Sequence, residues 1–249
     1  MCKKILPDKI LYNLLYEKGR QFSLLSPDSE ALGVMYPGKP LWLYIKDNWG
    51  TENVRAFFED CIEKLGGEIP GLVAPAKAAE FCGSLFHRPV TGRWEIAAFF
   101  MPGPAPYKPR GKLVSFNYND IPAAAKWLTD FYREALDVNL ENSENIAKAL
   151  INGKKIYGLE VQGLGISAMG MIIPLPEGMC RLNLIYTPPM YRGRGFGKDI
   201  TAFLAAKVQN EEKLPVLYAR TASEPAMRLY KSLGFVEAGR LVELRFGME

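Results

Sequence analysis

The chain has 249 residues, of which 48% are hydrophobic and 23% are charged, a balance that is ordinary for one large globular domain or two small ones. The net charge of +4 is too small an excess to predict a nucleic-acid-binding protein, and it is compatible with a small anionic ligand. Four widely spaced cysteines argue against a disulfide framework, and a single histidine argues against a zinc site or a histidine-activated nucleophile.

No segment of the sequence predicts secretion or membrane insertion. The N-terminal stretch MCKKILPDKILYNLL mixes charged and apolar residues, unlike a signal peptide. No apolar run approaches the roughly 18 residues that span a bilayer. We therefore expect a soluble cytoplasmic protein that binds neither membranes nor nucleic acids.

The first part of the chain predicts a small lobe of mixed α and β structure. The ranges 39–47 and 93–101 are rich in aromatic and branched side chains, which favours strands. One helix is expected from Thr51 to Gly66, because apolar residues recur at helical spacing between a capping residue and a terminating glycine. A second helix is expected after Pro75. No motif in this lobe points to chemistry.

A proline-rich segment divides the chain. FFMPGPAPYKPRGK, residues 99–112, contains four prolines and two glycines, which exclude a helix or a central strand. We interpret this segment as a linker and expect an N-terminal α+β lobe over residues 1–110 and a second domain over residues 111–249.

The second domain predicts the element order β-α-α-β-β-β-α-β-α-β. The expected strands are residues 113–118, 155–161, 165–175, 180–187, 215–220 and 237–246, and the expected helices begin near Asp120, Ser143, Lys198 and Glu224. The fourth of these strands leads directly into the segment that carries the most information.

That segment is TPPMYRGRGFGKDI, from Thr187 to Ile200. Its glycines are Gly193, Gly195 and Gly197, and its cations are Arg192, Arg194 and Lys198. Glycine lets a ligand approach the backbone closely, and the first amides of a helix have no intrahelical partner and lie at the positive end of its dipole. The segment therefore predicts an anion cradle that suits phosphate or pyrophosphate. The alternative is a glycine-rich turn with solvated cations. Neither the P-loop order nor the GxGxxG order is present.

Two motifs together resemble the signatures of one family. The pattern R-x-x-G-x-G, formed by Arg192, Gly195 and Gly197, resembles the acyl-CoA pyrophosphate loop of the GNAT N-acetyltransferase superfamily. About thirty residues later, SEPAMRLYKSLGF resembles its second signature, N-x-x-A-x-x-L-Y-x-x-x-G-F. The residues in register are Ala226, Leu229, Tyr230, Gly234 and Phe235. The resemblance covers roughly residues 113–246 and is strongest to a bacterial subgroup with an extra N-terminal lobe.

The resemblance implies an α/β (α+β) fold, the GNAT acyl-CoA N-acyltransferase fold. A mixed central sheet would be flanked by helices, with a second, smaller α+β lobe at the N-terminus. The size and mixed composition of that lobe make it a candidate for a degenerate copy of the same fold.

The resemblance also implies roles for individual residues. The backbone of the strand before the loop, including Ile185, Tyr186 and Thr187, would pair with the pantetheine arm of coenzyme A. The loop residues Arg192, Gly193, Arg194, Gly195, Phe196, Gly197 and Lys198 would hold the pyrophosphate. Tyr230 would protonate the leaving thiolate. As alternatives, the strand residues could be ordinary core residues, the loop cations could be solvated, and Tyr230 could simply pack on the core.

The sequence departs from the family pattern at two points. Ser223 stands where the family often has asparagine, so it is a candidate to bind pantetheine or a water, or simply to cap the following helix. The strand before the loop also offers no carboxylate to act as general base. Glu160 is the candidate, against the alternative of an outward-facing strand residue; Asn183, Tyr186 or a water chain could contribute instead.

The predicted function is an acetyl-CoA-dependent N-acetyltransferase. A small-molecule or peptide amine would attack acetyl-CoA, the co-substrate, directly within a ternary complex, and no metal would be needed. The protein is expected to be a monomer or a homodimer. Two alternatives stay open: a CoA-binding regulatory module without turnover, and an acyltransferase that uses a longer acyl donor or an aminoacyl donor on a larger carrier.

Overall fold

A computed structural model describes residues 21–46 and 48–247 of the chain. The N-terminal stretch considered above, Cys2 and Asp47 lie outside these residues. The strands are β1 (Phe22–Leu25), β2 (Ala31–Met35), β3 (Leu41–Ile45), β4 (Gly71–Pro75), β5 (Val90–Phe100), β6 (Lys112–Ser115), β7 (Ile156–Val161), β8 (Gly165–Leu175), β9 (Met179–Tyr186), β10 (Leu214–Arg220) and β11 (Val236–Phe246). The helices are α2 (Thr51–Lys64), α3 (Ala76–Leu85), α4 (Ile121–Leu136), α5 (Ser143–Asn152), α6 (Phe196–Asn210) and α7 (Glu224–Ser232).

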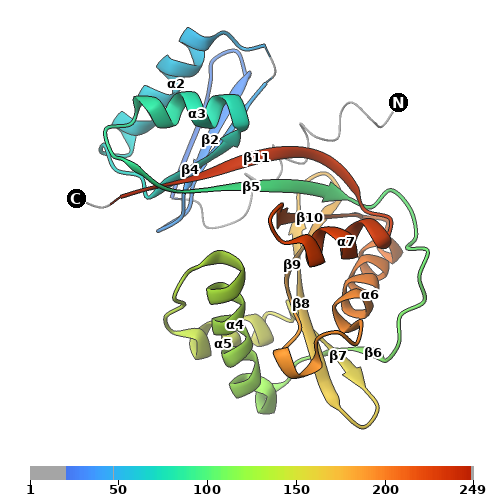
Figure 1. The fold of residues 1–249 in the computed structure, drawn as a ribbon. Coiled ribbons are helices and arrows are strands. Elements are labelled where there is room, and N and C mark those ends of the chain that lie inside the picture. Colours follow the sequence, from blue (N-terminus) through green and yellow to red (C-terminus); the bar gives the residue numbers. More distant parts are fainter. Residues whose placement is uncertain (1–20, 47, 248–249) are drawn as a thin grey trace.

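All the strands belong to one mixed sheet with the order β1-β2-β3-β4-β11-β5-β10-β9-β8-β7-β6 (Figure 1). The pairs β3/β4 and β9/β10 are parallel, and the other neighbours are antiparallel. The expected α+β class with a mixed sheet flanked by helices is confirmed. β1, β2 and β4 were not expected, and α6 begins two residues earlier than expected, at Phe196.

The two long strands β5 and β11 join the N-terminal and C-terminal parts of the chain. They pair with each other from Val236 opposite Phe100 to Phe246 opposite Val90. β11 then pairs with β4 on its other side, and β5 pairs with β10. One sheet therefore contains strands from both sides of residue 110 in the sequence, and the division into two domains at this residue stays a prediction.

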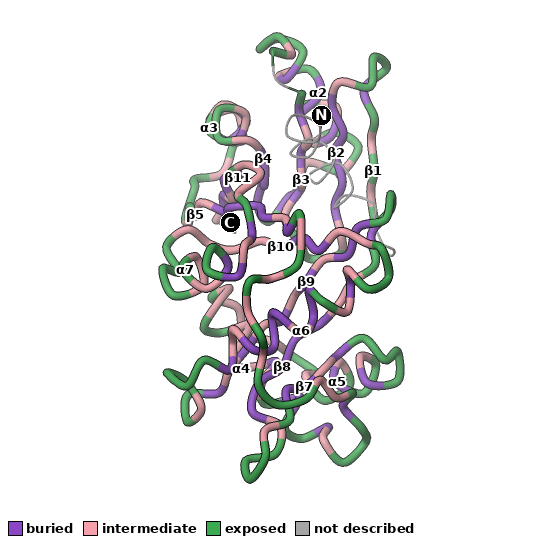
Figure 2. The backbone as a smooth tube through the Cα atoms, turned by 90° about the vertical axis from the view of Figure 1, so that its right-hand side faces the viewer, coloured by how far each residue is buried: buried purple, intermediate pink, exposed green. Residues whose placement is uncertain are grey.

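The helices cover the two faces of the sheet unequally. On one face, α2 and α3 pack over the N-terminal strands with Val242 and Leu244 of β11, and α6 and α7 pack over the C-terminal strands with Ala97 and Phe99 of β5. These β5 and β11 residues share a face, because Val242 lies opposite Glu95 in the ladder. α4 and α5 cover the other face over β7 to β9 only, in a core that includes Met169. Figure 2 shows that buried residues are common along the strands and that exposed residues are common in the loops.

Within the described residues, no helix is both long enough and apolar enough to cross a membrane. The proline-rich segment is irregular between β5 and β6, as expected, but it is anchored to α6. The side chain of Gln209 donates a hydrogen bond of 2.7 Å to the carbonyl of Gly103. Further along the segment, the guanidinium of Arg110 donates a 2.6 Å hydrogen bond to the carbonyl of Arg194, so this part of the segment lies next to the glycine-rich loop.

Candidate active site

The site begins where the parallel pair β9/β10 separates. The two strands are paired only from Leu214 opposite Met179 to Val216 opposite Arg181. Beyond this point β10 follows β5 as far as Arg220, and β9 follows β8 as far as Tyr186. A cavity of about 630 Å³ opens between the diverging strands, and it is lined by residues of β5, β9, β10, β11, α4 and α7.

A bulge in β9 turns the backbone at the edge of this cavity. Tyr186 lies opposite Met169 and Asn183 lies opposite Met171, so two residues of β9 face one residue of β8. Leu184 in the bulge has a φ of 51°, and its amide donates a 2.8 Å hydrogen bond to the side chain of Asn183. Leu184 and Tyr186 consequently pack with α4, whereas Ile185 packs with α6 and α7. Beyond Arg181, the edge of β9 toward β10 has no strand partner among the described residues.

The glycine-rich loop forms a second cavity, of about 610 Å³, on the other side of Thr187. α6 begins at Phe196, and its N-cap, Gly195, has a φ of 85°, a conformation that glycine adopts without strain. In the described part of the chain, the backbone amides from Gly193 to Gly197 donate no hydrogen bond, whereas Lys198 already donates to the carbonyl of Gly195. The loop therefore presents a row of free donors at the positive end of a helix.

The cations of the loop are placed differently from one another. Arg192 and Lys198 line the second cavity, together with Arg228 of α7. The Nζ of Lys198 also lies 4.5 Å from the ring centre of Tyr107. Arg194 is exposed and is not among the lining residues. Gly197 is close to Leu229 and Thr187, at 3.3 and 3.4 Å from an added Cβ, so its lack of a side chain also serves helix packing.

A buried carboxylate holds the proline-rich segment against the loop. Asp199 of α6 is fully buried and accepts hydrogen bonds from the Tyr107 hydroxyl at 2.6 Å, the Arg110 amide at 3.0 Å and the Arg110 guanidinium at 2.8 Å. The same guanidinium donates to the carbonyl of Arg194 at 2.6 Å. Burial and the bond to Asp199 raise the pKa of Tyr107. Arg110 thus adds a cation beside the loop that the sequence did not indicate.

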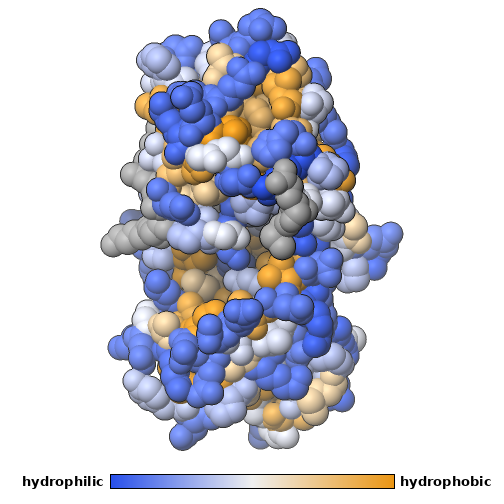
Figure 3. Space-filling view, turned by 90° about the vertical axis from the view of Figure 1, so that its left-hand side faces the viewer, coloured by the Kyte–Doolittle hydropathy of each residue, from blue (hydrophilic) through white to orange (hydrophobic). Residues whose placement is uncertain are grey.

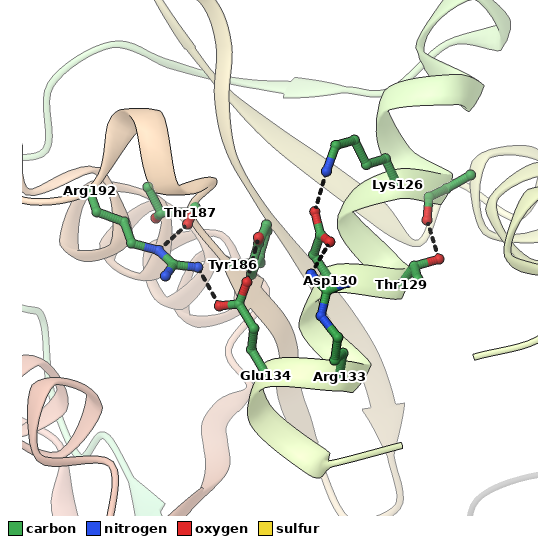
Figure 4. A network of polar contacts seen from close by, with 9 residues as sticks. Lys126, Thr129, Asp130, Arg133, Glu134, Tyr186, Thr187 and Arg192 are labelled. Carbon is green, nitrogen blue, oxygen red and sulfur yellow. Dashed lines mark hydrogen bonds and ion pairs between the residues drawn. The ribbon is translucent and has the colours of Figure 1, made fainter. Parts of the chain in front are cut away.

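Glu134 connects α4 to the loop (Figure 4). It accepts a hydrogen bond of 2.5 Å from Arg192 and one of 3.3 Å from the Tyr186 hydroxyl, and it lines the first cavity. Arg192 also donates to the carbonyl of Thr187 at 2.9 Å. Burial, followed by the charges of Glu134 and Asp130, raises the pKa of Tyr186 to about 12. Arg192 is therefore held between two cavities by a fixed set of partners.

Tyr230 lines the first cavity from α7. It is 8% exposed and packs against Phe99 and Phe235. Burial raises the pKa of Tyr230 to about 12, so its phenol keeps its proton throughout the neutral range. Ser223 lines the same cavity, and its side chain makes no capping bond although it is the N-cap of α7.

The structure brings most of the predicted site residues together. Ile185, Tyr186, Ser223 and Tyr230 line the first cavity, whereas Thr187, Arg192, Gly193, Gly195, Phe196, Gly197 and Lys198 line the second. Glu160 is exposed on β7, pairs with Lys112 of β6 and lines neither cavity. Glu134 and Glu243 are instead the carboxylates that line the first cavity. Local sequence offered no signal for them, because each reaches the cavity only through tertiary structure.

Comparison with known proteins agrees with this arrangement. Residues 157–244 match the family model of FR47-like proteins. An acetyltransferase of the GNAT family from Colwellia psychrerythraea superimposes with a TM-score of 0.59 at 14% identity, covering 91% of this chain and 85% of that one. The chain has the GNAT fold. At the level of the fold, the GNAT resemblance that the two motifs indicated is confirmed.

Other solved GNAT structures match over nearly the whole chain. A GCN5-related N-acetyltransferase from Kribbella flavida gives a TM-score of 0.59 at 16% identity over 98% of this chain and 96% of that one. One from Sphaerobacter thermophilus gives 0.59 at 15% identity over 90% and 81%. No curated protein sequence matches the chain. The agreement therefore extends to the N-terminal strands and helices at the level of fold.

Proposed function

We propose that this protein is an acetyl-CoA-dependent N-acetyltransferase that acts on a primary amine. The observation that carries the proposal is the row of free amides from Gly193 to Gly197 beside a cavity that opens between β9 and β10. Free amides at the N-terminus of a helix are well suited to bind a diphosphate. An arm that extends from the diphosphate past Thr187 reaches the free edge of β9.

Donor binding follows from these features. The loop amides, with Arg192 and Lys198 beside them, would bind the pyrophosphate of acetyl-CoA. The unpaired backbone edge of β9 near Ile185 would hydrogen-bond the pantetheine amides, as an added strand would. A backbone N–H of this edge would also polarise the thioester carbonyl and stabilise the oxyanion.

In the proposed reaction, the neutral amine attacks the acetyl carbonyl, a C–N bond forms, and the C–S bond breaks. The products are the acetylated amine and coenzyme A with a free thiol. Glu134 and Glu243 are the cavity carboxylates placed to bind an ammonium group and to take its proton. Tyr230 would donate a hydrogen bond to the departing sulfur.

The pKa of Tyr230 limits what this residue can do. Full transfer of a proton from a phenol of pKa about 12 to a thiolate near 8.5 costs roughly 5 kcal/mol. Burial of the thiolate in the same cavity narrows this gap, because desolvation raises the pKa of a thiol. We therefore assign Tyr230 the role of a hydrogen-bond donor whose proton follows the sulfur as the C–S bond breaks.

A non-catalytic CoA-binding module is the second candidate, favoured by the lack of a carboxylate on β9. A longer acyl donor has less support. The small residues of β8 pack closely: a Cβ added at Gly170 would lie 2.4 Å from Leu204, so the space beside them is already filled.

The test is release of free coenzyme A from acetyl-CoA in the presence of small amines and short peptides. We expect amine-dependent release, and we expect Tyr230→Phe to lower kcat by about 100-fold while the Kd for CoA stays within a factor of three. CoA binding without release for any amine would favour the binding module.

A further inference from the structure

The lining of the first cavity includes a guanidinium, at the end of β10, that has no role in the proposed reaction. Arg220 ends β10 and lines the cavity. Its Nε is buried and has no hydrogen-bond partner among the described residues, and its Nη2 donates only a 3.3 Å bond to the carbonyl of Leu136. Burial lowers the pKa of Arg220, and the charges of Glu243 and Asp137 oppose this shift only in part. A buried donor without an acceptor is costly, so this wall is suited to an anion.

The sheet register places an aromatic ring against this guanidinium. Ile96 of β5 lies opposite Arg220, and Trp94, two residues before it, lies opposite Glu243 of β11. These side chains therefore share one face of the sheet. The ring centre of Trp94 lies 4.4 Å from the Arg220 guanidinium and 4.5 Å from that of Arg245. Stacking on the indole holds the plane of Arg220 in place.

Arg245 already has polar partners in the protein and does not line the first cavity, so Arg220 is the cation of this lining that a ligand can contact. Arg245 donates to the carbonyl of Leu136 at 2.6 Å and lies 3.6 Å from a carboxylate oxygen of Glu243. Arg220 lies within 4 Å of no carboxylate in the described residues. The C-terminal part of α4, from Phe131 to Leu136, also lines the cavity, and the carbonyl of Leu136 contacts both guanidinium groups. On this side of the molecule a hollow lies between the two halves, with apolar side chains at its margins (Figure 3).

Building on the proposed function, we infer that the acceptor is a free amino acid, whose carboxylate binds Arg220 while its amine lies on the side of Glu134 and Glu243. A carboxylate presents two oxygens in one plane, which matches the edge of a guanidinium. The lining carries one cation and two carboxylates, which suits a zwitterion. Glu134 and Glu243 already face Arg192 and Arg245, so a phosphate dianion would add two negative charges that Arg220 alone would have to balance.

The inference is tested by the same coenzyme A release assay with matched acceptors. The acceptors are the twenty common L-amino acids, each beside its carboxamide, with phosphoethanolamine as the phosphate-bearing amine. We expect at least one amino acid to be acetylated with a kcat/KM about 100-fold above that of its carboxamide. Phosphoethanolamine is expected to react no better than the carboxamides.

The variant Arg220→Gln separates recognition from stability. It should lower kcat/KM for the amino acid by about 100-fold but change that for the carboxamide by less than threefold, so that the selectivity between the two disappears. The Kd for CoA should not change. The matched control is Arg240→Gln, because Arg240 is exposed on β11 and pairs with Glu237 outside both cavities.

The outcomes are distinguishable. Equal turnover of amino acids and carboxamides, or preference for phosphoethanolamine, overturns the inference and leaves the acetyltransferase proposal intact. A parallel loss for both acceptors in Arg220→Gln shows a structural role and also overturns it. If no amine of any kind causes release of coenzyme A, both the proposed function and the inference are overturned.

Discussion

The two ends of the site are built in different ways. The diphosphate end consists of backbone donors in one contiguous segment, residues 187–198, with a buried carboxylate beneath it. The acceptor end consists of side chains from β5, α4, β10 and β11, namely Trp94, Glu134, Arg220 and Glu243. A contiguous backbone site depends on loop conformation, whereas a dispersed side-chain site depends on sheet register. The two ends should therefore respond differently to substitution.

The largest effect on the diphosphate end should come from Asp199→Asn. The amide keeps the shape of Asp199 but loses its charge, and its NH2 group replaces one accepting oxygen, so that a donor faces either Tyr107 and the Arg110 amide or the Arg110 guanidinium. We expect the free energy of unfolding, measured with urea, to fall by about 3 kcal/mol. The control is Asp60→Asn, which removes an exposed pair with Lys64 and should cost less than about 1 kcal/mol. If the two variants lower the free energy of unfolding equally, Asp199 does not hold the proline-rich segment in the way described.

A smaller and more local effect is expected from Gly195→Ala. The added Cβ must adopt a φ of 85° and would lie 2.8 Å from the Arg110 guanidinium. The loop must shift to relieve the strained φ and the close contact with Arg110, so we expect the Kd for CoA, measured by calorimetry, to rise about tenfold. Gly178→Ala imposes a similar φ, 71°, in open space between β8 and β9. If Gly178→Ala weakens CoA binding equally, the loop conformation is not what binds the ligand.

The smallest effect is a pH dependence that reports on Tyr230, which faces the acceptor cavity. Its pKa is about 12 in the folded protein and 10.0 ordinarily, so the unfolded chain releases this proton first as the pH rises. Stability from this group is complete below pH 10 and is lost toward pH 12, with a loss of about 1.4 kcal/mol by pH 11. Urea unfolding at pH 8 and pH 11 measures it. The difference should shrink in Tyr230→Phe, and an undiminished difference would show that Tyr230 is not the group that titrates.

The same contrast explains what the sequence could and could not predict. The loop, the register of Tyr230 and most elements of the second domain were predictable, because each rests on residues close together in the chain. The hydroxyl of Ser223 proved free of a capping role, which local pattern alone could not decide. The position of Glu160 in a predicted strand made it the candidate base, but in the sheet order β7 lies between β6 and β8, away from the cavity.

Trp94, Glu134 and Glu243 of the acceptor end gave no local signal, for a physical reason. Trp94 and Glu243 become neighbours only because β5 and β11 pair along their whole length, and Glu134 reaches the cavity only because α4 packs beneath β9. No periodicity within β5, β11 or α4 encodes those pairings. The early start of α6 has a local cause that was overlooked, since the left-handed Gly195 is itself the N-cap.

Binding of a diphosphate by the free amides of the loop can be measured by calorimetry. Titration of the full chain with CoA, and separately with pantetheine, compares ligands that share the thiol arm but differ in the diphosphate. We expect clear binding of CoA and a Kd for pantetheine that is at least about 100-fold higher. Absence of heat with CoA, or equal affinity for the two ligands, would contradict it.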